Sequence, residues 1–351
     1  MSHCIEIGSE FELPDNINEK SENDFFDDWE LTYSGRTSLH LVLDEICSEE
    51  VKRKAWLPSY CCASMMQPFI EKKLPVEFYN VDFNSEGKIS RESFAPDGND
   101  IVLSMSYFGF SDKNNNELIE KCIKNSITVI EDCTHSLLLK NNKFIADYRI
   151  ASVRKWFPLA SGGGIKKREG AIVWNSIKPD SRLVRIRIDA MKEKTEYLYS
   201  QQDEKKKNNY LAKYRQFNES LALNYQNRII DNWSSSVLLR QDIEYIIETR
   251  RENASVLING IKKFDRIKPL FYELGDDDCP LFVPILVKDR EKLQQLLVKN
   301  KIYCPVHWPR PCNKAMTDLY ETELSLICDQ RYSSTDMIKI LEVIGQFEKE
   351  C

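Results

Sequence analysis

The sequence has no long hydrophobic run, and none of its 351 residues lie in a stretch that approaches the length of a membrane span. Its first residues, MSHCIEIGSEFELPD, show no basic segment followed by an apolar one, so a secretory leader is not expected. There is no basic excess, because 49 basic and 55 acidic residues are interspersed. A nucleic-acid partner would favour a basic stripe. We therefore expect a soluble cytoplasmic protein with neither a membrane nor a nucleic acid as its partner.

Several motifs for cofactors and metals are also missing. Neither a Gly-x-Gly-x-x-Gly loop nor a Walker-type loop occurs, which gives little support to an enzyme of nicotinamides or nucleoside triphosphates. The sequence has no Cys-x-x-Cys pair and no cysteine–histidine spacing typical of zinc. The eleven cysteines are odd in number, and the adjacent Cys61 and Cys62 have poor geometry for a disulfide. We expect no metal, and mostly reduced thiols packed as small apolar groups.

Short apolar runs alternate with amphipathic segments along the first half of the chain. Strands are predicted at 54–60, 75–81, 99–106, 128–130 and 148–153, with helices over 37–47, 61–71 and 114–125. A loop with a short helix is predicted at 87–98, and a further strand at 170–174 precedes charged helices over 181–226, 234–239 and 243–258. This alternation is typical of an α/β fold with a mostly parallel sheet between helices.

The length favours two packed subdomains rather than one core. Residues 1–30 are acidic and irregular, and we interpret them as an arm whose Phe25, Phe26 and Trp29 dock on the first domain. Residues 31–255 would form a large α/β domain. Residues 256–351 hold apolar strands at 281–287 and 302–306 and helices at 290–299 and 334–349, which predicts a smaller α+β domain.

Two polar clusters end neighbouring strands of the central stretch, 129–165. Glu131-Asp132-Cys133-Thr134-His135 follows the first strand, and Ser152-Val153-Arg154-Lys155 follows the second. In open α/β sheets, ligand chemistry collects at the carboxyl ends of the strands. A crowded lysine loses proton affinity and can attack a carbonyl to form a Schiff base.

Pyridoxal phosphate needs such a lysine, a carboxylate for its ring nitrogen and donors for its phosphate. Lys155, Asp132 and Ser152 match these three roles. The alternative is that Asp132 caps a turn, Lys155 lies on the surface and Ser152 is incidental. The three together favour a site. The glycines of Ser161-Gly162-Gly163-Gly164 would let the backbone pass close to a ligand or a partner chain.

The segments SGRTSLH (34–40), LPSYCCASMMQPF (57–69), YFG (107–109), IEDCTHSL (130–137) and SVRKW with the following GGG resemble sugar aminotransferases of the DegT/DnrJ/StrS type. These are fold-type I pyridoxal phosphate enzymes with an aspartate-aminotransferase-like fold, and the resemblance covers roughly positions 30 to 345. It implies transfer of an amino group, commonly from glutamate, to a nucleotide-linked keto sugar of surface-polysaccharide or secondary-metabolite biosynthesis. It also implies a homodimer with shared active sites.

The resemblance assigns the cofactor's phosphate to Gly35, Arg36, Thr37 and Ser152. Small hydroxyl residues at a helix start suit an anion, although an ordinary N-cap has the same pattern. Arg36 stands where the family usually has a small residue, and it would either bind the phosphate or face solvent. The family often places four residues between its serine and its lysine, whereas only two separate Ser152 from Lys155.

Other residues are matched to the cofactor ring. Cys62 matches a position where family members often carry an aromatic that stacks on the ring. A thiol cannot stack, so Tyr60 is the candidate replacement. His135 lies three residues after Asp132, where the family places a residue over the ring.

Three residues are candidate substrate contacts. Tyr107 is either a substrate contact or a core tyrosine. His307 is either a substrate contact or a structural histidine. Arg331 would bind a carboxylate or phosphate, or make a capping or interdomain ion pair. The segment 224–228 (NYQNR) loosely resembles an Asn-Tyr-Arg turn that the family extends into the partner's site.

Two other functions compete with a sugar aminotransferase. One is a pyridoxal phosphate enzyme with a non-sugar acceptor or another outcome, such as dehydration; dehydrating relatives usually have histidine in place of the lysine, so Lys155 argues against them. The other is a non-catalytic binding or regulatory protein. Lys155 and Asp132 argue against it, and Cys62 in place of an aromatic argues for it.

Overall fold

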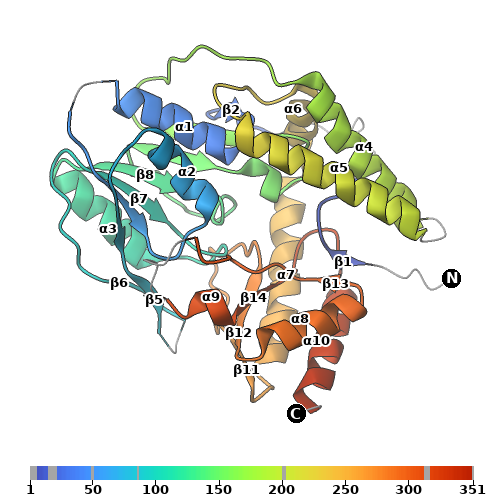
Figure 1. The fold of residues 1–351 in the computed structure, drawn as a ribbon. Helices are drawn as coiled ribbons and strands as arrows, with labels where there is room; N and C mark the ends of the chain where they lie inside the picture. Colours follow the sequence, from blue (N-terminus) through green and yellow to red (C-terminus); the bar gives the residue numbers. More distant parts are fainter. Residues whose placement is uncertain are drawn as a thin grey trace. The chain divides into compact units, whose positions relative to one another are not determined.

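The computed structural model describes residues 6–14, 22–48, 51–84, 87–199, 203–311 and 317–349. Contacts group the chain into two compact units (Figure 1). Unit 1 comprises Met1–Glu6, Glu10–Glu49 and Ile150–Ile243, and unit 2 comprises Ile7–Ser9, Glu50–Arg149 and Glu244–Cys351. The predicted domain boundaries at 30 and 255 are sequence-based and stay predictions.

Unit 2 contains the parallel strands that the sequence predicts. In spatial order these are β8 (Thr128–Asp132), β7 (Ile101–Met105), β3 (Ala55–Pro58) and β4 (Val76–Tyr79), each parallel to its neighbour. The helices α2 (Ala63–Glu71) and α3 (Lys113–Lys124) connect them. All five residues of β7 are buried, as expected of a parallel strand covered on both faces. The α/β prediction is confirmed.

The segment predicted as a loop with a short helix is instead part of a hairpin. Strand β6 (Ile89–Arg91) pairs antiparallel with β5 (Val81–Phe83), and the described residues of 87–98 contain no helix. Gly87 has a φ of +76°, which side-chain-bearing residues rarely adopt, and its N–H bonds the carbonyl of Asn84 at 2.9 Å. The prediction of a helix here is therefore wrong, because the glycine closes a turn.

A second, antiparallel sheet in unit 2 has the order β11 (Ile267–Pro269), β12 (Val283–Val287), β14 (Glu323–Leu326). The helices of this part are α7 (Ile243–Ile261), α8 (Arg290–Lys299), α9 (Leu319–Thr322) and α10 (Ser334–Lys349). The bounds of α8 and α10 are those predicted. Strand β13 (Ile302–Tyr303) pairs in parallel with β1 (Ile7–Gly8), and Ile7 lies opposite Ile302.

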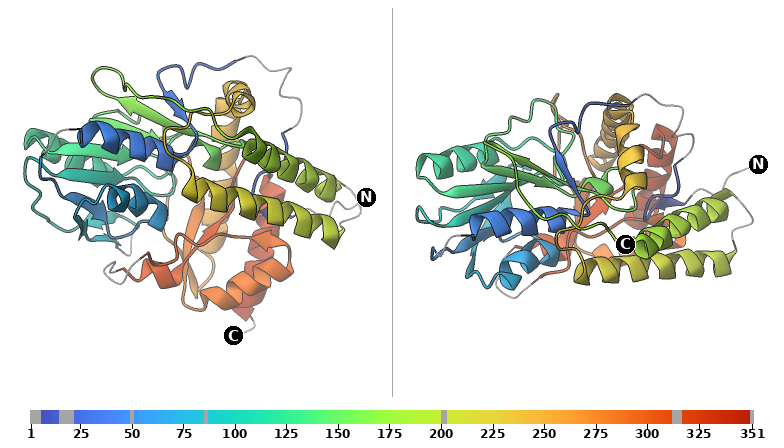
Figure 2. Two further views of the ribbon diagram at one scale, coloured as in Figure 1. Left: turned by 45° about the horizontal axis from the view of Figure 1, so that its top comes forward. Right: turned by 90° about the horizontal axis from the view of Figure 1, so that it is seen from above.

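Unit 1 pairs β2 (Glu30–Thr32) antiparallel with β10 (Gly163–Lys167). Strand β9 (Tyr148–Ala151), of which only Ile150 and Ala151 belong to this unit, leads into the 3₁₀ turn η2 (Val153–Lys155). The helices are α1 (Gly35–Ile46), α4 (Ser181–Tyr199), α5 (Glu204–Leu223) and α6 (Asn232–Leu239), and α4 and α5 lie side by side (Figure 2).

The strand predicted at 170–174 is wrong. Those residues form no strand and Val173 is 94% exposed, whereas the preceding glycines form β10. A Cβ atom at Gly163 would lie 2.2 Å from the carbonyl carbon of Ser34, and one at Gly164 would lie 2.6 Å from the ring of Trp29. The glycine run therefore approaches other parts of its own unit.

The arm before β2 docks on unit 1 through ion pairs and aromatic contacts. Glu10 pairs with Arg187 of α4 at 2.8 Å, and Glu12 lies 3.2 Å from Lys194 of the same helix. Phe26 is buried, with its ring 5.9 Å from that of Phe157. The predicted docking of the arm's aromatic residues is confirmed for Phe26 and Trp29.

Within the described residues no disulfide is formed by the cysteines Cys47, Cys61, Cys62, Cys122, Cys133, Cys279, Cys304 and Cys328. Burial raises the pKa of Cys279 and of Cys304 to about 12, so both stay protonated. Within the described ranges, no group of three or more histidine, cysteine or carboxylate side chains is arranged to hold a metal ion. None of the helices described has the length and apolar character needed to cross a membrane.

Candidate functional site

The predicted site residues are divided between the two units. Unit 1 carries Gly35, Arg36, Thr37, Ser152 and Lys155, and unit 2 carries Tyr60, Cys62, Tyr107, Asp132, His135, His307 and Arg331.

The turn that begins α1 is a well-formed N-cap. The Ser34 hydroxyl accepts a hydrogen bond from the Thr37 N–H at 3.1 Å and lies 3.0 Å from the Thr37 hydroxyl. That hydroxyl in turn donates to the carbonyl of Tyr225 at 2.8 Å. The same turn presents the positive end of the α1 dipole, the feature that makes helix starts suitable for phosphate. The N-cap interpretation is therefore confirmed, and anion binding at this turn stays a prediction.

The structure brings Ser152 against this turn. A Cβ atom at Gly35 would lie 2.9 Å from the Ser152 Cβ and 3.1 Å from its Cα. Lys155 follows on η2, where its N–H bonds the Ser152 carbonyl at 3.2 Å and its side chain is half-buried. The 3₁₀ turn explains the short serine–lysine spacing, because three residues complete one turn. Two predicted phosphate-binding elements, distant in sequence, thus meet in unit 1.

We predict that Gly35→Ala destabilises the protein by about 2 kcal/mol, because the added methyl forces Ser152 to move. Urea unfolding monitored by fluorescence would measure the loss. Gly98→Ala is the control, since its Cβ would meet only the Asn125 carbonyl at 3.7 Å. Equal stability of the two variants would contradict the tight contact between the turn and Ser152.

The segment 224–228 folds against α1 of its own unit. Tyr225 is fully buried, with the Arg36 guanidinium 5.4 Å from its ring centroid and the His40 ring 5.7 Å away. The Arg228 Nε donates to the Asn224 carbonyl at 2.8 Å, which closes the turn. Sequence reasoning missed that Tyr225 supports Arg36 and Thr37, and only the weak NYQNR match pointed to this segment.

A buried polar cluster fixes the segment that follows η2. The Ser161 hydroxyl donates to Asp231 at 2.6 Å. The Ser234 hydroxyl accepts from the N–H groups of Ala160 and Ser161, both at 3.0 Å. Asp231 also caps α6 through the Ser234 N–H at 2.9 Å. This cluster was not predicted, although Asp231 before α6 fits a helix-start pattern.

In unit 2 the carboxyl ends of β3, β7 and β8 share one edge, as predicted. Asp132 is the last residue of β8, opposite Met105 of β7. It is 6% exposed, and its Oδ1 accepts from the Thr134 N–H at 2.8 Å. The preceding Glu131 forms a buried ion pair with Arg149 at 2.7 Å. Asp132 is thus a buried carboxylate at the end of a strand that the Glu131–Arg149 ion pair helps to fix.

An aromatic–histidine group lies at this edge and consists of Tyr60, Tyr107, Phe108, His135, His307 and Trp308. The rings of His135 and His307 are 5.2 Å apart, and that of Trp308 is 5.4 Å from His135. The Tyr60 ring lies 5.0 Å from Trp308 and 5.5 Å from Tyr107. Four predicted residues, Tyr60, Tyr107, His135 and His307, are therefore brought together.

Hydrogen bonds order this group. The buried Tyr107 hydroxyl donates to the Tyr60 carbonyl at 2.8 Å, and the Tyr60 hydroxyl donates to the His307 carbonyl. The Phe108 N–H donates to His135 Nδ1 at 3.2 Å, so a neutral His135 carries its proton on Nε2. Sequence reasoning missed Phe108 and Trp308, which flank the predicted Tyr107 and His307.

Cys62 lies outside the aromatic–histidine group. It occupies the N-cap position of α2, and its sulfur lies 2.9 Å from the Ser64 hydroxyl. Tyr60, two residues earlier, supplies the aromatic ring at this strand end. Contact of Tyr60 with a cofactor ring stays a prediction.

His307 belongs to a buried network with Ser325 and Glu323. Its Nδ1 lies 2.7 Å from the Ser325 hydroxyl, which donates to Glu323, and its N–H donates to the other Glu323 oxygen at 2.7 Å. Burial raises the pKa of Glu323 to about 8, although these hydrogen bonds and the charge of Arg290 oppose the shift. Glu323 is therefore largely protonated at neutral pH.

This shift predicts a pH dependence of stability. Below a pH of about 4.5, Glu323 is protonated in both states, and between about 4.5 and about 8 only the folded state keeps the proton. The contribution of Glu323 is thus complete at low pH and is lost as pH rises, by at most about 1.4 kcal/mol per pH unit. Glu323→Gln, which mimics the protonated acid, should remove this slope.

Urea unfolding at several pH values from 5 to 8 would compare the two slopes. Glu321→Gln is the matched control, because Glu321 is an exposed carboxylate of the adjoining helix, paired with Arg310 at 2.7 Å. Parallel stability curves for wild type and Glu323→Gln would contradict the raised pKa.

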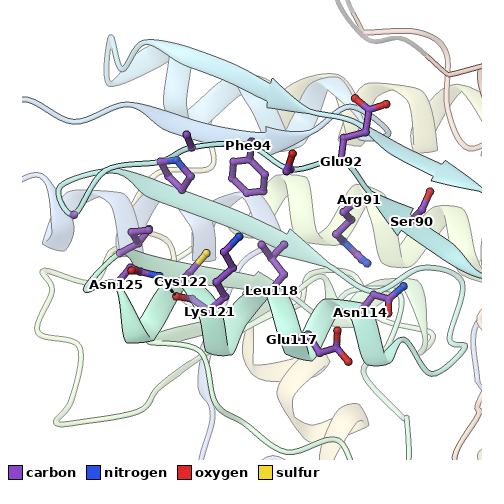
Figure 3. A pocket seen from close by; sticks show the side chains of 15 residues that line it. Ser90, Arg91, Glu92, Phe94, Asn114, Glu117, Leu118, Lys121, Cys122 and Asn125 are labelled. Carbon is purple, nitrogen blue, oxygen red and sulfur yellow. Dashed lines mark hydrogen bonds between the residues drawn. The ribbon is translucent and has the colours of Figure 1, made fainter.

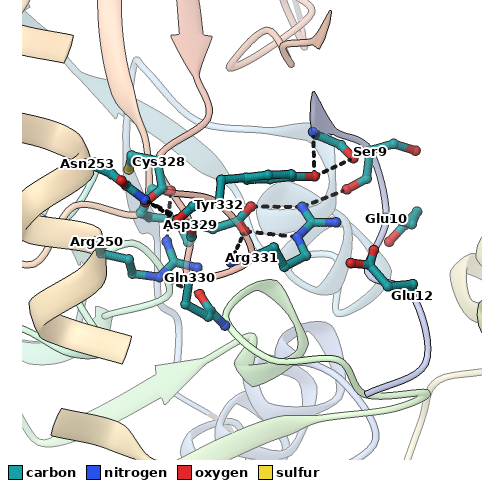
Figure 4. A network of polar contacts seen from close by, with 12 residues as sticks. Ser9, Glu10, Glu12, Arg250, Asn253, Cys328, Asp329, Gln330, Arg331 and Tyr332 are labelled. Carbon is teal, nitrogen blue, oxygen red and sulfur yellow. Dashed lines mark hydrogen bonds and ion pairs between the residues drawn. The ribbon is translucent and has the colours of Figure 1, made fainter. Parts of the chain in front are cut away.

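Arg331 makes an ion pair close to the N-terminal strand. Its guanidinium binds Asp329 through Nε at 2.9 Å and Nη2 at 2.8 Å, and it donates to the Ser9 carbonyl at 3.2 Å (Figure 4). Burial alone would raise the pKa of Asp329, but the charge of Arg331 lowers it. The Tyr332 hydroxyl accepts from the Gly8 N–H at 2.8 Å. Arg331 thus has a structural role in unit 2, and substrate binding by it stays a prediction.

A pocket of about 720 Å³ lies elsewhere in unit 2, between the segment after β6 and α3 (Figure 3). Phe94 and Leu118 face each other across it. At its wall, the Arg91 guanidinium pairs with Asp112 at 2.6 Å. None of the predicted site residues lines this pocket. The size of this pocket therefore gives no reason to place the predicted cofactor site there.

Comparison with known proteins establishes the fold. No family model matches the sequence, and no curated protein matches it. Helicobacter pylori PseC is an aminotransferase involved in the biosynthesis of pseudoaminic acid, and its structure is similar to this one with a TM-score of 0.68. The two sequences are 14% identical, and the match covers 99% of this chain and 100% of the PseC chain. The pyridoxal phosphate form of Spr1654 from Streptococcus pneumoniae, named only as a candidate sugar aminotransferase, is 14% identical with a TM-score of 0.64, covering 98% and 93%.

The sugar aminotransferase CalS13 from Micromonospora echinospora is also similar. It is 12% identical with a TM-score of 0.62, covering 96% of this chain and 98% of its own. At these identities the similarity is one of fold. It confirms the α/β fold type I that the sequence predicts.

Proposed function

We propose that this chain is a pyridoxal phosphate-dependent aminotransferase that moves an amino group from an amino acid such as glutamate to a nucleotide-linked keto sugar. The observation that carries the proposal is the contact between Gly35 and Ser152, which joins the start of α1 to the turn bearing Lys155. Further support comes from the shared fold, since several of the similar structures are sugar aminotransferases and one is a pyridoxal phosphate form.

The residues present fit this cofactor. In unit 1, the start of α1 carries the Arg36 guanidinium and hydroxyl groups, and it lies against the turn that bears the half-buried Lys155. This arrangement suits a phosphate ester beside a reactive amine. In unit 2, Asp132 is a buried carboxylate at a strand end. Arg36 and Ser152 would hold the phosphate, and Arg36 would add charge that a small residue cannot. Thr37, whose hydroxyl donates to the Tyr225 carbonyl, would shape the turn.

Pyridoxal phosphate, when bound, supplies a conjugated ring that withdraws electrons from the carbon bearing the reacting amine. Lys155 would hold it covalently between turnovers. Its Nζ would act as the base that takes a proton from the α-carbon of the amino donor and, in the second half of the reaction, as the acid that supplies a proton to the reacting carbon of the acceptor. The Asp132 carboxylate would keep a proton on the ring nitrogen, and His135 would lie over the ring.

The aromatic–histidine group of unit 2 would bound the substrate region. The Tyr107 and Tyr60 hydroxyls stay protonated, because burial raises the pKa of both well above the usual value. We propose that His307 contacts the acceptor and that the Glu323 network fixes its ring. We also propose a cytoplasmic homodimer with shared active sites, on the strength of the sequence resemblance, acting in polysaccharide or secondary-metabolite biosynthesis.

An absorption spectrum of the purified protein with added pyridoxal phosphate tests this function. An absorption band near the visible edge, shifted by glutamate, would support both cofactor and amino donor, and an acceptor screen would follow. Absence of the band would contradict the proposal and favour a non-catalytic binding or regulatory protein. A band shifted by amino acids without turnover of any nucleotide-linked keto sugar would indicate a non-sugar acceptor.

A further inference from the structure

A buried guanidinium lies in the α4–α5 part of unit 1. Arg187 of α4 is 1% exposed, and its guanidinium carbon lies 4.8 Å from the Tyr214 ring centroid and 5.2 Å from that of Phe217. One terminal nitrogen pairs with Glu10 at 2.8 Å. The Nε and Nη1 atoms, also buried, have no hydrogen-bond partner among the described residues. Buried donors are normally satisfied, so these two atoms point to a ligand.

Two further buried donors belong to side chains that interact electrostatically with Arg187. Tyr33, 1% exposed, has its ring 6.1 Å from that of Phe217, and its buried hydroxyl has no partner in the part of the chain that the structure describes. The buried Nε of Arg154, on η2, also has no hydrogen-bond partner among the described residues. Both side chains are electrostatic neighbours of Arg187. The donors come from α4, from the end of β2 and from the turn that carries Lys155.

The balance of charge favours an anion. Arg187 and Arg154 bring two positive charges, and Glu10, the acidic neighbour of both, brings one negative charge. Burial and the charges of Arg187 and Arg36 lower the pKa of Arg154 to about 10, although Glu10 opposes the shift. The charge of Arg187 therefore disfavours the charged form of Arg154, and a bound dianion would relieve this repulsion.

We propose that Arg187, Arg154 and Tyr33 form a binding site for a phosphate-type oxyanion. Guanidinium groups and a phenol supply only donors to such a ligand, and charge-assisted hydrogen bonds from guanidinium groups to phosphate oxygens are among the strong ones. A bound oxyanion would tie α4 to η2, and hence hold the turn that carries Lys155. The ligand is free inorganic phosphate, because the proposed function already places the cofactor's phosphate at Arg36 and Ser152.

Calorimetric titration of the cofactor-free protein with sodium phosphate tests the site, with sodium chloride at equal ionic strength as the reference. Wild-type protein should bind phosphate and not chloride. Arg187→Met should weaken binding at least about tenfold, the effect expected of a lost charged hydrogen bond. Tyr33→Phe removes a hydroxyl alone and should weaken it about threefold. Arg185→Met, at an exposed position of α4, is the matched control and should bind like wild type.

A second titration at saturating pyridoxal phosphate separates this site from that of the cofactor. Phosphate binding that persists supports a separate oxyanion site, and binding that disappears would assign the phosphate to the cofactor's site and overturn the proposal. Phosphate binding by the cofactor-free protein stands even where the proposed function fails. Absence of phosphate binding by wild type, or unchanged binding by both Arg187→Met and Tyr33→Phe, would overturn the site.

Discussion

Replacing Lys155 by methionine is expected to reduce kcat/KM for transamination by about four orders of magnitude, since one amine would provide both covalent attachment and proton transfer. Methionine has a similar length and no amine. Lys155 is half-buried on η2, so the fold should tolerate the change. Steady-state kinetics with glutamate, together with the absorption spectrum, would measure the loss.

The control for this variant is Lys178→Met, which removes an exposed lysine of the same unit. Its spectrum and rate should match those of wild type. Sodium borohydride should fix the cofactor to the wild-type protein and to Lys178→Met, but not to Lys155→Met. Labelling of Lys155→Met at another lysine would refute the assignment of Lys155.

Replacing Asp132 by asparagine is expected to lower kcat about a thousandfold, because the uncharged amide cannot hold a proton on the ring nitrogen. Without this proton, the ring withdraws electrons less strongly. Asparagine keeps an oxygen that can accept the Thr134 N–H, the bond that Asp132 makes at 2.8 Å. A purely structural Asp132 would therefore show little change in kcat.

The kinetic measurement for Asp132→Asn should accompany an unfolding curve, in which we expect a small change. Asp276→Asn alters an exposed carboxylate of the same unit and serves as the control. Loss of stability with unchanged kcat in Asp132→Asn would reverse the assignment and make Asp132 a turn residue.

Elements with a strong local pattern were predicted well. Helices α8 and α10 have the predicted bounds, because their apolar residues recur at the helical period within one continuous segment. The strand at Gly163–Lys167 was missed for the opposite reason. Glycine has low strand propensity, and β10 exists because its bare backbone can approach Ser34. The apolar run at 170–174 pairs with no strand in the described structure.

The candidate site was predictable where strand order decides it. Tyr60, Tyr107, Asp132 and His135 all follow parallel strands, whose carboxyl ends share one edge of a sheet. Tyr225 could not be predicted in the same way. Its role depends on contact with α1, from which it is separated by much of the chain. A sequence shows such a residue's type but not its neighbours.

The partners of Glu323 and Arg331 were hidden as well. Glu323 is protonated because of burial beside His307, and burial is a property of the folded chain. The Arg331 guanidinium binds the Asp329 carboxylate of the same protein, in place of the substrate anion that the sequence suggested. The sequence-based alternative was a capping or interdomain ion pair; the observed pair is local, between residues two positions apart in unit 2.

The pairing of β1 with β13 has a consequence for synthesis on the ribosome. Every segment of unit 1 has been made once residue 243 is reached, so that unit can assemble on the nascent chain. Ile7 must wait until Ile302 emerges, and it stays an unpaired strand edge in the meantime. Completion of unit 2 is therefore a late, long-range step in the folding of the growing chain.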